Sequence, residues 1–129
     1  ILAVLAGVVV GSVINMGLVM LGPMVIAIPE GVDVTSSESI AKSMHLFGFQ
    51  HFIFPFLAHA AGTFAGAMAA AWIAASRKSM FAMLIGLVFL IGGIANIIMI
   101  SSPWAFNVID LVFSYIPMAW FAGKIMTRK

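Results

Sequence analysis

Residues 80–100 read MFAMLIGLVFLIGGIANIIMI. This stretch contains no charged residue, and the amide of Asn96 is its one strongly polar side chain. An α-helix needs about 20 predominantly apolar residues to cross the hydrocarbon core of a bilayer. The stretch therefore predicts a transmembrane helix, and three other parts of the chain have a similar length and composition.

The predicted transmembrane spans cover residues 2–28, 49–75, 80–100 and 104–125. The connections after the second and third spans are only a few residues long, so neighbouring helices must run antiparallel. Proline removes a backbone donor and crowds the preceding turn, so each proline inside a span is expected to kink or end its helix. These prolines are Pro23, Pro55 and Pro117. We expect an all-α fold, an integral membrane four-helix bundle that forms one domain over residues 1–129.

The composition supports this fold class. Of the 129 residues, 64% are hydrophobic and 8% are charged, whereas soluble domains have about 45–50% apolar and about 25% charged residues. So few charges cannot coat a water-soluble surface, and the lipid bilayer is the expected partner. The composition excludes a cytosolic enzyme and a nucleic-acid-binding module. The absence of cysteine also excludes disulfides and Cys-based zinc or iron–sulfur sites.

The cations predict the orientation of the chain. They gather in the turn between spans two and three and after span four, and these two places lie on one side of a four-span protein. The residues concerned are Arg77, Lys78, Lys124, Arg128 and Lys129. By the positive-inside bias, both termini are expected in the cytoplasm and the loop over residues 29–48 on the non-cytoplasmic side, where Lys42 is the one exception.

A short amphipathic surface helix is predicted in this outer loop between helices one and two. Thr35 and Glu38 have the spacing of a capping box, and Gly48 is a plausible stop. The residues between them alternate with helical spacing between an apolar face (Ile40, Met44, Phe47) and a polar face (Glu38, Lys42, His45). Such a helix would lie on the membrane surface as a lid for the bundle, or would gate a site beneath it.

Polar residues inside the predicted spans are the candidates for function, because ionisable groups are costly in hydrocarbon. The main candidates for ligand or proton binding are His59, Asp110, Asn96 and His51, and the secondary candidates are Asn15, Asn107, His45 and Glu30. Helical spacing places the polar groups within the spans on the packing side. We therefore expect a polar cavity in the outer half of the bundle, where imidazole and carboxylate groups can pass a proton or bind a small solute.

The same cluster has a structural alternative, in which Asp110 bonds only Asn96 or a backbone amide freed by Pro117. The three histidines lack the spacing of known metal motifs, so the sequence predicts no particular metal ion. It does not identify a cofactor either.

Three functions remain in view. The first is a protein that binds or moves a small polar solute, a proton or a cation through the outward cavity. The second is a non-catalytic accessory subunit of a larger membrane complex. As partners we expect either such a complex or further copies of the chain in a homo-oligomer. An enzyme acting on quinone, lipid or haem is third, because common catalytic motifs are absent from the sequence.

Overall fold

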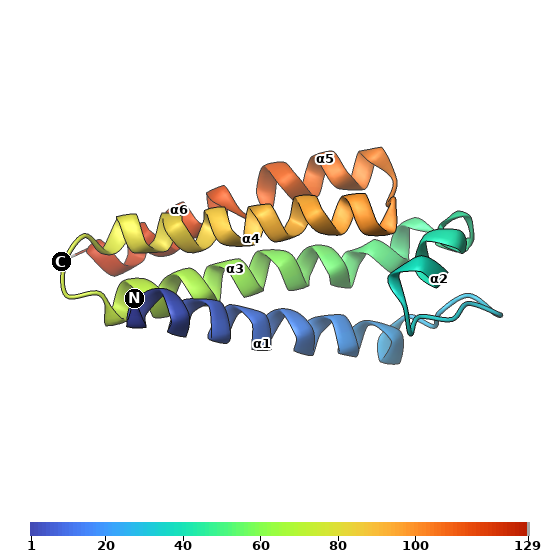
Figure 1. The fold of residues 1–129 in the computed structure, drawn as a ribbon, viewed down its shortest axis with the longest axis horizontal. Coiled ribbons are helices and arrows are strands. Elements are labelled where there is room, and N and C mark those ends of the chain that lie inside the picture. The colour runs from blue at the N-terminus through green and yellow to red at the C-terminus, as the bar shows by residue number, and fades with distance from the viewer. Residues whose placement is uncertain (129) are drawn as a thin grey trace.

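The structure is a computed structural model that describes residues 1–128, and all regular structure in that range is helical (Figure 1). Within it, four helical segments are long and apolar enough to span a membrane. They are α1 (Leu2–Val25), the 3-10 turn η2 (Phe49–Phe52) with α3 (Ile53–Ile73), α4 (Lys78–Ile100), and the pair α5 (Trp104–Phe113) and α6 (Ile116–Thr127). The prediction of an all-α fold with four such segments is confirmed.

Helix α3 occupies the centre of the bundle. It packs against α1 on one side and against α4 and α6 on the other (Figure 1). The start of α1, the α3–α4 turn and the end of α6 lie together, and we call this the terminal end of the bundle. The opposite end carries the short helix α2 (Ser37–Lys42), and we call it the α2 end.

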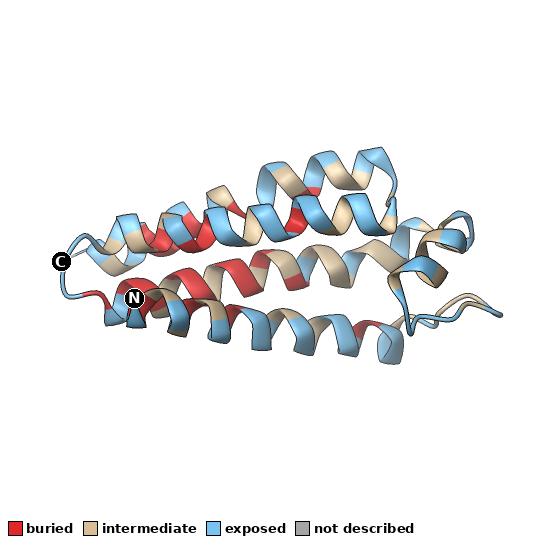
Figure 2. Ribbon diagram, viewed as in Figure 1, coloured by how far each residue is buried: buried red, intermediate tan, exposed pale blue. Residues whose placement is uncertain are grey.

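The core is built from small side chains on α3, α4 and α6. Its buried members are Ala67, Ala70, Ala71, Ala82, Ile85, Ala119 and Ala122. Figure 2 shows that buried residues concentrate toward the terminal end, while the α2 end holds mostly intermediate and exposed residues. Alanine lets helices approach closely, so the terminal end is the tightly packed part of the molecule.

Helices α1 and α3 approach until their backbones nearly touch. A Cβ atom added at Gly66 would lie 2.5 Å from the carbonyl oxygen of Gly7, and one added at Gly62 would lie 2.8 Å from that of Gly11. No side chain fits at these contacts, which explains why glycine occupies these positions on both helices. The pairing fixes the register of α1 on α3 and hence the position of Asn15, one turn after Gly11.

The fourth segment is interrupted. Helix α5 ends at Phe113, α6 begins at Ile116, and Ser114 and Tyr115 form the break. Pro117 is the cause, because it has no N–H to donate to the carbonyl of Phe113 and its ring crowds the preceding turn. The predicted effect of this proline is confirmed, but the span over 104–125 is two helices rather than one.

The other two prolines lie at helix ends. Pro23 is in the last turn of α1, and Pro55 is in the first turn of α3, where a missing donor costs little. Helix α1 ends at Val25 rather than at the predicted residue 28, because Ile26 is already extended (φ −119°, ψ 109°).

The predicted capping box at Thr35 is wrong. Ser36 caps α2, and its Oγ accepts a hydrogen bond of 3.2 Å from the backbone N–H of Ser39. The Thr35 hydroxyl instead donates to Asp33 Oδ1 at 2.6 Å. The Thr35 hydroxyl therefore bonds Asp33 and does not cap the N-terminus of α2. This bond lowers the pKa of Asp33.

Helix α2 is shorter than the predicted surface helix. It ends at Lys42, whose ammonium group is 2.7 Å from Glu38, and a 3-10 turn, η1 (Met44–Leu46), follows. Gly48 begins the next 3-10 turn, η2, rather than ending the helix. Both members of the Lys42–Glu38 pair are exposed, so the pair contributes little to stability.

Candidate functional site: a cavity at the α2 end with a histidine–aspartate pair

A cavity of about 570 Å³ lies at the α2 end, between α1 and α4. Near the terminal end these two helices touch, with Gly7 against Ile85 and Gly11 against Phe89. Farther along, residues of both helices line the cavity instead, beginning with Asn15 on α1 and including Asn96 on α4. The cavity is therefore the space left where α1 and α4 part.

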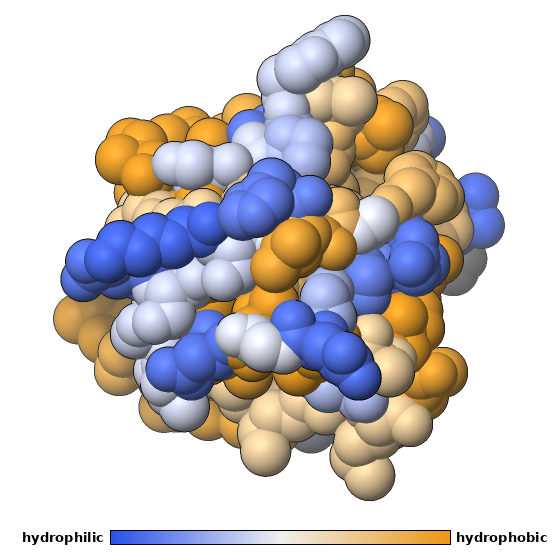
Figure 3. Space-filling view, turned by 90° about the vertical axis from the view of Figure 1, so that its right-hand side faces the viewer, coloured by the Kyte–Doolittle hydropathy of each residue, from blue (hydrophilic) through white to orange (hydrophobic). Residues whose placement is uncertain are grey.

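The loop that carries α2 contributes to the wall of this cavity. Its apolar side chains Val34, Ile40, Met44 and Phe47 line the cavity together with residues of α1, α3 and α5. Viewed from the α2 end, hydrophilic side chains surround a hydrophobic centre (Figure 3).

The cavity is less polar than predicted. Of the described residues that line it, six have polar side chains, namely Asn15, Gln50, His51, His59, Asn96 and Ser102. The remaining lining residues are mostly aliphatic, aromatic and methionine side chains, because the α2 loop turns its apolar face inward.

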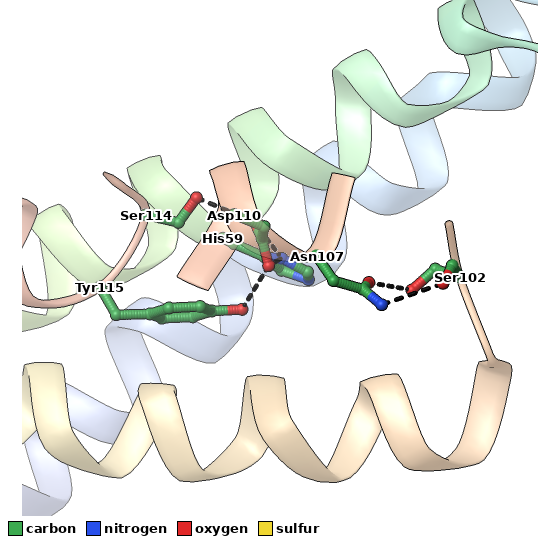
Figure 4. Close-up of polar contacts among 6 residues, drawn as sticks. All are labelled: His59, Ser102, Asn107, Asp110, Ser114 and Tyr115. Carbon is green, nitrogen blue, oxygen red and sulfur yellow. Dashed lines mark hydrogen bonds and ion pairs between the residues drawn. The ribbon is translucent and has the colours of Figure 1, made fainter. Parts of the chain in front are cut away.

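His59 and Asp110 form the closest polar contact between two of the long helical segments (Figure 4). The Nδ1 atom of His59, on α3, lies 2.9 Å from Oδ1 and 2.8 Å from Oδ2 of Asp110, on α5. The Asp110 residue is 1% exposed, and the His59 side chain is 15% exposed. The expected convergence of these two residues is confirmed, although Asp110 does not itself line the cavity.

Two hydroxyl groups complete the surroundings of Asp110. Ser114 Oγ donates to Oδ1 at 2.8 Å, and Tyr115 OH donates to Oδ2 at 3.0 Å (Figure 4). The Tyr115 ring also stacks on His59, with centroids 5.7 Å apart. An ionised carboxylate only accepts hydrogen bonds, so this set of donors fits a carboxylate and requires a proton on His59 Nδ1.

The second ring nitrogen of His59 has no hydrogen-bond partner in the described part of the chain. Within residues 1–128, Nε2 makes no hydrogen bond, and the ring lines the cavity. With the proton of a neutral ring held on Nδ1, Nε2 is an acceptor of hydrogen bonds or of a proton. A carboxylate that orients a histidine in this way is a recurring arrangement in proton-transfer sites and behind metal-binding histidines.

Asn15 supplies a second free acceptor. Its Oδ1 atom is buried without a hydrogen-bond partner in the described part of the chain. The residue lies against Gly62, one helical turn after His59 on α3, and it lines the same cavity. A buried polar atom without a partner is costly, so it marks a place where a ligand or water would be bound.

The other predicted residues have different surroundings. Asn96 lines the cavity, as predicted, but the hydrogen bonds of Asp110 in residues 1–128 go to other residues. His51 also lines it, but both of its ring nitrogens are occupied by backbone groups: Nδ1 accepts from the Gly48 N–H at 2.8 Å, and Nε2 lies 3.0 Å from the Ala27 carbonyl oxygen. His51 thus ties the end of α1 to the start of the α3 segment.

Three secondary candidates lie outside the cavity. Asn107 donates to the Ser102 carbonyl at 2.9 Å and stabilises the turn between α4 and α5. His45 and Glu30 are exposed on the α2 loop and do not line the cavity. Geometry therefore groups His59, Asp110, Asn96 and Asn15, and it separates them from these three.

The arrangement does not itself define a metal site. In residues 1–128, no three side chains of His, Asp or Glu lie close enough together to hold a metal ion.

Comparison with protein-family profiles, with curated proteins and with solved structures gave no match to this chain.

Proposed function

We propose that this chain is a multi-pass membrane protein with both termini in the cytoplasm and the α2 loop on the opposite side. The support is the outward-facing apolar surface of the long helices, including Val13, Ile98 and Val108, each more than half exposed in the absence of lipid. The cations at the terminal end support the orientation.

Cysteine accessibility tests this orientation, because the chain has no native cysteine. Glu38→Cys on α2 and Ser76→Cys in the α3–α4 turn both replace exposed residues. In intact cells, a membrane-impermeant maleimide should label the first variant and spare the second until the cells are lysed. The reverse pattern would contradict the proposed orientation.

We further propose that the cavity binds a small ligand, or accepts a proton or cation, at His59. The observation that carries this proposal is that the two ring nitrogens of His59 have different surroundings. Nδ1 is held by both oxygens of Asp110 at 2.8–2.9 Å, while Nε2 has no protein partner in residues 1–128 and the ring borders a cavity. Holding the ring in one orientation and one tautomer prepares Nε2 to exchange a proton or hydrogen-bond a solute without reorganisation.

Proton movement in liposomes tests the role of His59. Purified protein is reconstituted around the pH-sensitive dye pyranine, a proton gradient is applied, and the dye signal is followed with and without potassium or ammonium ions. His59→Gln should abolish the protein-dependent signal, and His45→Gln, which alters an exposed imidazole outside the cavity, should leave it unchanged. Helical circular dichroism of both variants shows whether they are folded. A folded His59→Gln variant with the wild-type signal would refute the role of His59 in proton movement.

An accessory subunit is the second candidate. One observation favours it: Gly17 on α1 and Gly92 on α4 each have open space where a Cβ would lie, with no atom within 4 Å in the described chain. Such notches in an apolar surface allow another helix to approach closely. Extraction from native membranes in mild detergent, followed by mass measurement, tests this function. A species of 13.7 kDa or a simple multiple of it would contradict the subunit hypothesis.

A further inference from the structure

We infer that the ligand of this cavity is an uncharged amphiphile, with a head that donates hydrogen bonds and an apolar body. This inference rests on the proposed ligand-binding function and adds the chemical class of the ligand. Three properties of the cavity carry it: the character of its walls, the hydrogen-bonding groups at its deep end, and its exposure along the side of the bundle.

The walls favour an uncharged and largely apolar molecule. Among the described residues that line the cavity there is no Asp, Glu, Lys or Arg. The Asp110 carboxylate, which contacts the lining residue His59, belongs to a residue that is 1% exposed, and its oxygens are already occupied by His59, Ser114 and Tyr115. An ion in the cavity would lose its hydration shell without gaining an opposite charge, which is unfavourable. An apolar body gains from burial against side chains such as Phe54 and Phe106.

The deep end of the cavity favours a hydrogen-bond donor. His59 Nε2 is an acceptor, because Asp110 holds the ring proton on Nδ1. Asn15 Oδ1 is a second acceptor, and it is buried without a partner in residues 1–128. A ligand hydroxyl group would satisfy His59 Nε2, and Asn15, which lines the same cavity, supplies the other acceptor. A head that can only accept would leave both acceptors without a donor, which is costly in a buried site.

The side of the bundle gives such a molecule a route from lipid. Helices α1 and α4 meet at Gly11 and Phe89, and beyond this contact both helices line the cavity together with α3, α5 and the α2 loop. Met20 and Val19 line the cavity and are 66% and 40% exposed, so the wall that α1 contributes is open to the surroundings of the bundle. The apolar body can therefore lie between α1 and α4, with its head pointing inward to His59.

The size of the cavity is compatible with one such molecule. A volume of about 570 Å³ falls within the range of about 300–1,000 Å³ that is usual for small-molecule sites.

Methionine methyl NMR tests this inference on the full chain in detergent micelles. Met20 and Met44 line the cavity and report on it, and Met80, at the terminal end, is the control. The probes are 4-hexylphenol, which donates a hydrogen bond, and 4-hexylanisole, which has nearly the same shape but no donor. We expect saturable shifts of Met20 and Met44 with 4-hexylphenol, no comparable shift of Met80, and an affinity about tenfold higher than for 4-hexylanisole, a difference typical of one buried hydrogen bond.

The His59→Phe variant should bring the two affinities together by weakening 4-hexylphenol alone. The variant Asn15→Leu removes the other acceptor on a different helix, so the test stays decisive if one variant fails to fold. Equal affinity of the wild type for both probes, or a preference for hexylammonium over 4-hexylphenol, would overturn the inference and leave the proposed binding function intact. If no probe, including hexylammonium, acetate and glycerol, shifts Met20 or Met44, this inference and the ligand-binding part of the proposed function both fail, and the proton assay alone decides the role of His59.

Discussion

The substitution Asp110→Asn should reverse the hydrogen-bonding character of His59 toward the cavity. It replaces one carboxylate oxygen by an NH₂ group while keeping the size of the side chain. An NH₂ group beside Nδ1 is a donor, so the favourable partner becomes a ring that carries its proton on Nε2. The wild-type ring presents an acceptor to the cavity, and the variant ring should present a donor.

The cost to stability follows from the partners of Asp110. Three donors, His59 Nδ1, Ser114 Oγ and Tyr115 OH, bond the carboxylate at 2.8–3.0 Å. Hydrogen bonds to a charged group contribute about 1.5–3 kcal/mol each, and neutral ones about 0.5–1.5 kcal/mol. The loss is partly offset because a buried charge is also removed. We expect Asp110→Asn to lower the free energy of unfolding by about 1–3 kcal/mol, and Asp110→Ala, which leaves all three donors without an acceptor, by about 3–5 kcal/mol.

Nitrogen-15 NMR of labelled histidine measures the tautomer directly. The chain has three histidines, and the signals of His59 are those missing from the His59→Gln variant. Spectra are recorded near pH 8.5, well above the usual histidine pKa of about 6.5. Thermal unfolding in the same detergent gives the stability of each variant.

The wild type should show His59 with its proton on Nδ1, and Asp110→Asn should move it to Nε2. His51 is the internal control, because its Nδ1 accepts from a backbone N–H and its Nε2 faces a carbonyl, so it should have its proton on Nε2 in both proteins. A wild-type His59 protonated on Nε2 alone would refute the reasoning about the site, whatever the stability of the variants.

Two further predictions concern Tyr115 and the α2 loop. Gly93→Ala places a Cβ atom 2.6 Å from Tyr115 Cζ, while Gly92→Ala meets no atom within 4 Å. In thermal unfolding, Gly93→Ala should destabilise the protein by about 1–3 kcal/mol and Gly92→Ala should not. Equal effects of the two substitutions would show that the Tyr115 ring does not pack against α4. Thr35→Val should raise the pKa of Asp33 in a carboxyl ¹³C NMR titration, because valine lacks the hydroxyl that stabilises the ionised form and keeps only the backbone N–H bond. Since the folded-state pKa of Asp33 is lowered, these bonds are complete at neutral pH and are lost as the pH falls through that lowered value, and an unchanged titration would contradict the pairing.

Much of the fold follows from the sequence, because runs of apolar residues and their spacing determine where long helices form. Helical spacing also placed His59 and Asp110 on the packing sides of their helices. The sequence predicts a polar cavity in the outer half of the bundle, and the structure joins His59 and Asp110 directly. Helical spacing was sufficient to predict the packing face of His59 and of Asp110, because the face on which a residue lies depends on its own helix alone.

The role of Tyr115 could not be read from spacing. In a continuous helix, residues five apart do not lie on the same face, so Tyr115 would point away from Asp110. The break at Ser114 and Tyr115 turns the ring back to the carboxylate. Pro117 was the available signal, but a proline predicts that a helix is interrupted and not where the next side chain will point.

The character of the cavity also depended on more than one element. It is set by where α1 and α4 part and by which face of the α2 loop turns inward. The loop prediction was wrong in detail because Asp33, only two residues from Thr35, competes for the same hydroxyl. Competition of this kind is decided by loop conformation, which spacing alone does not specify.

The interruption of the fourth segment has a mechanical consequence. Ser114 and Tyr115 form the joint between α5 and α6. Both donate hydrogen bonds to the Asp110 carboxylate, which also orients the His59 ring. A change at the Asp110 carboxylate therefore affects the break between the helices and the orientation of the His59 ring together. Chemistry at the imidazole and the bend between α5 and α6 are thereby linked, and by thermodynamic reciprocity a force that straightens the joint would alter how the ring holds its proton.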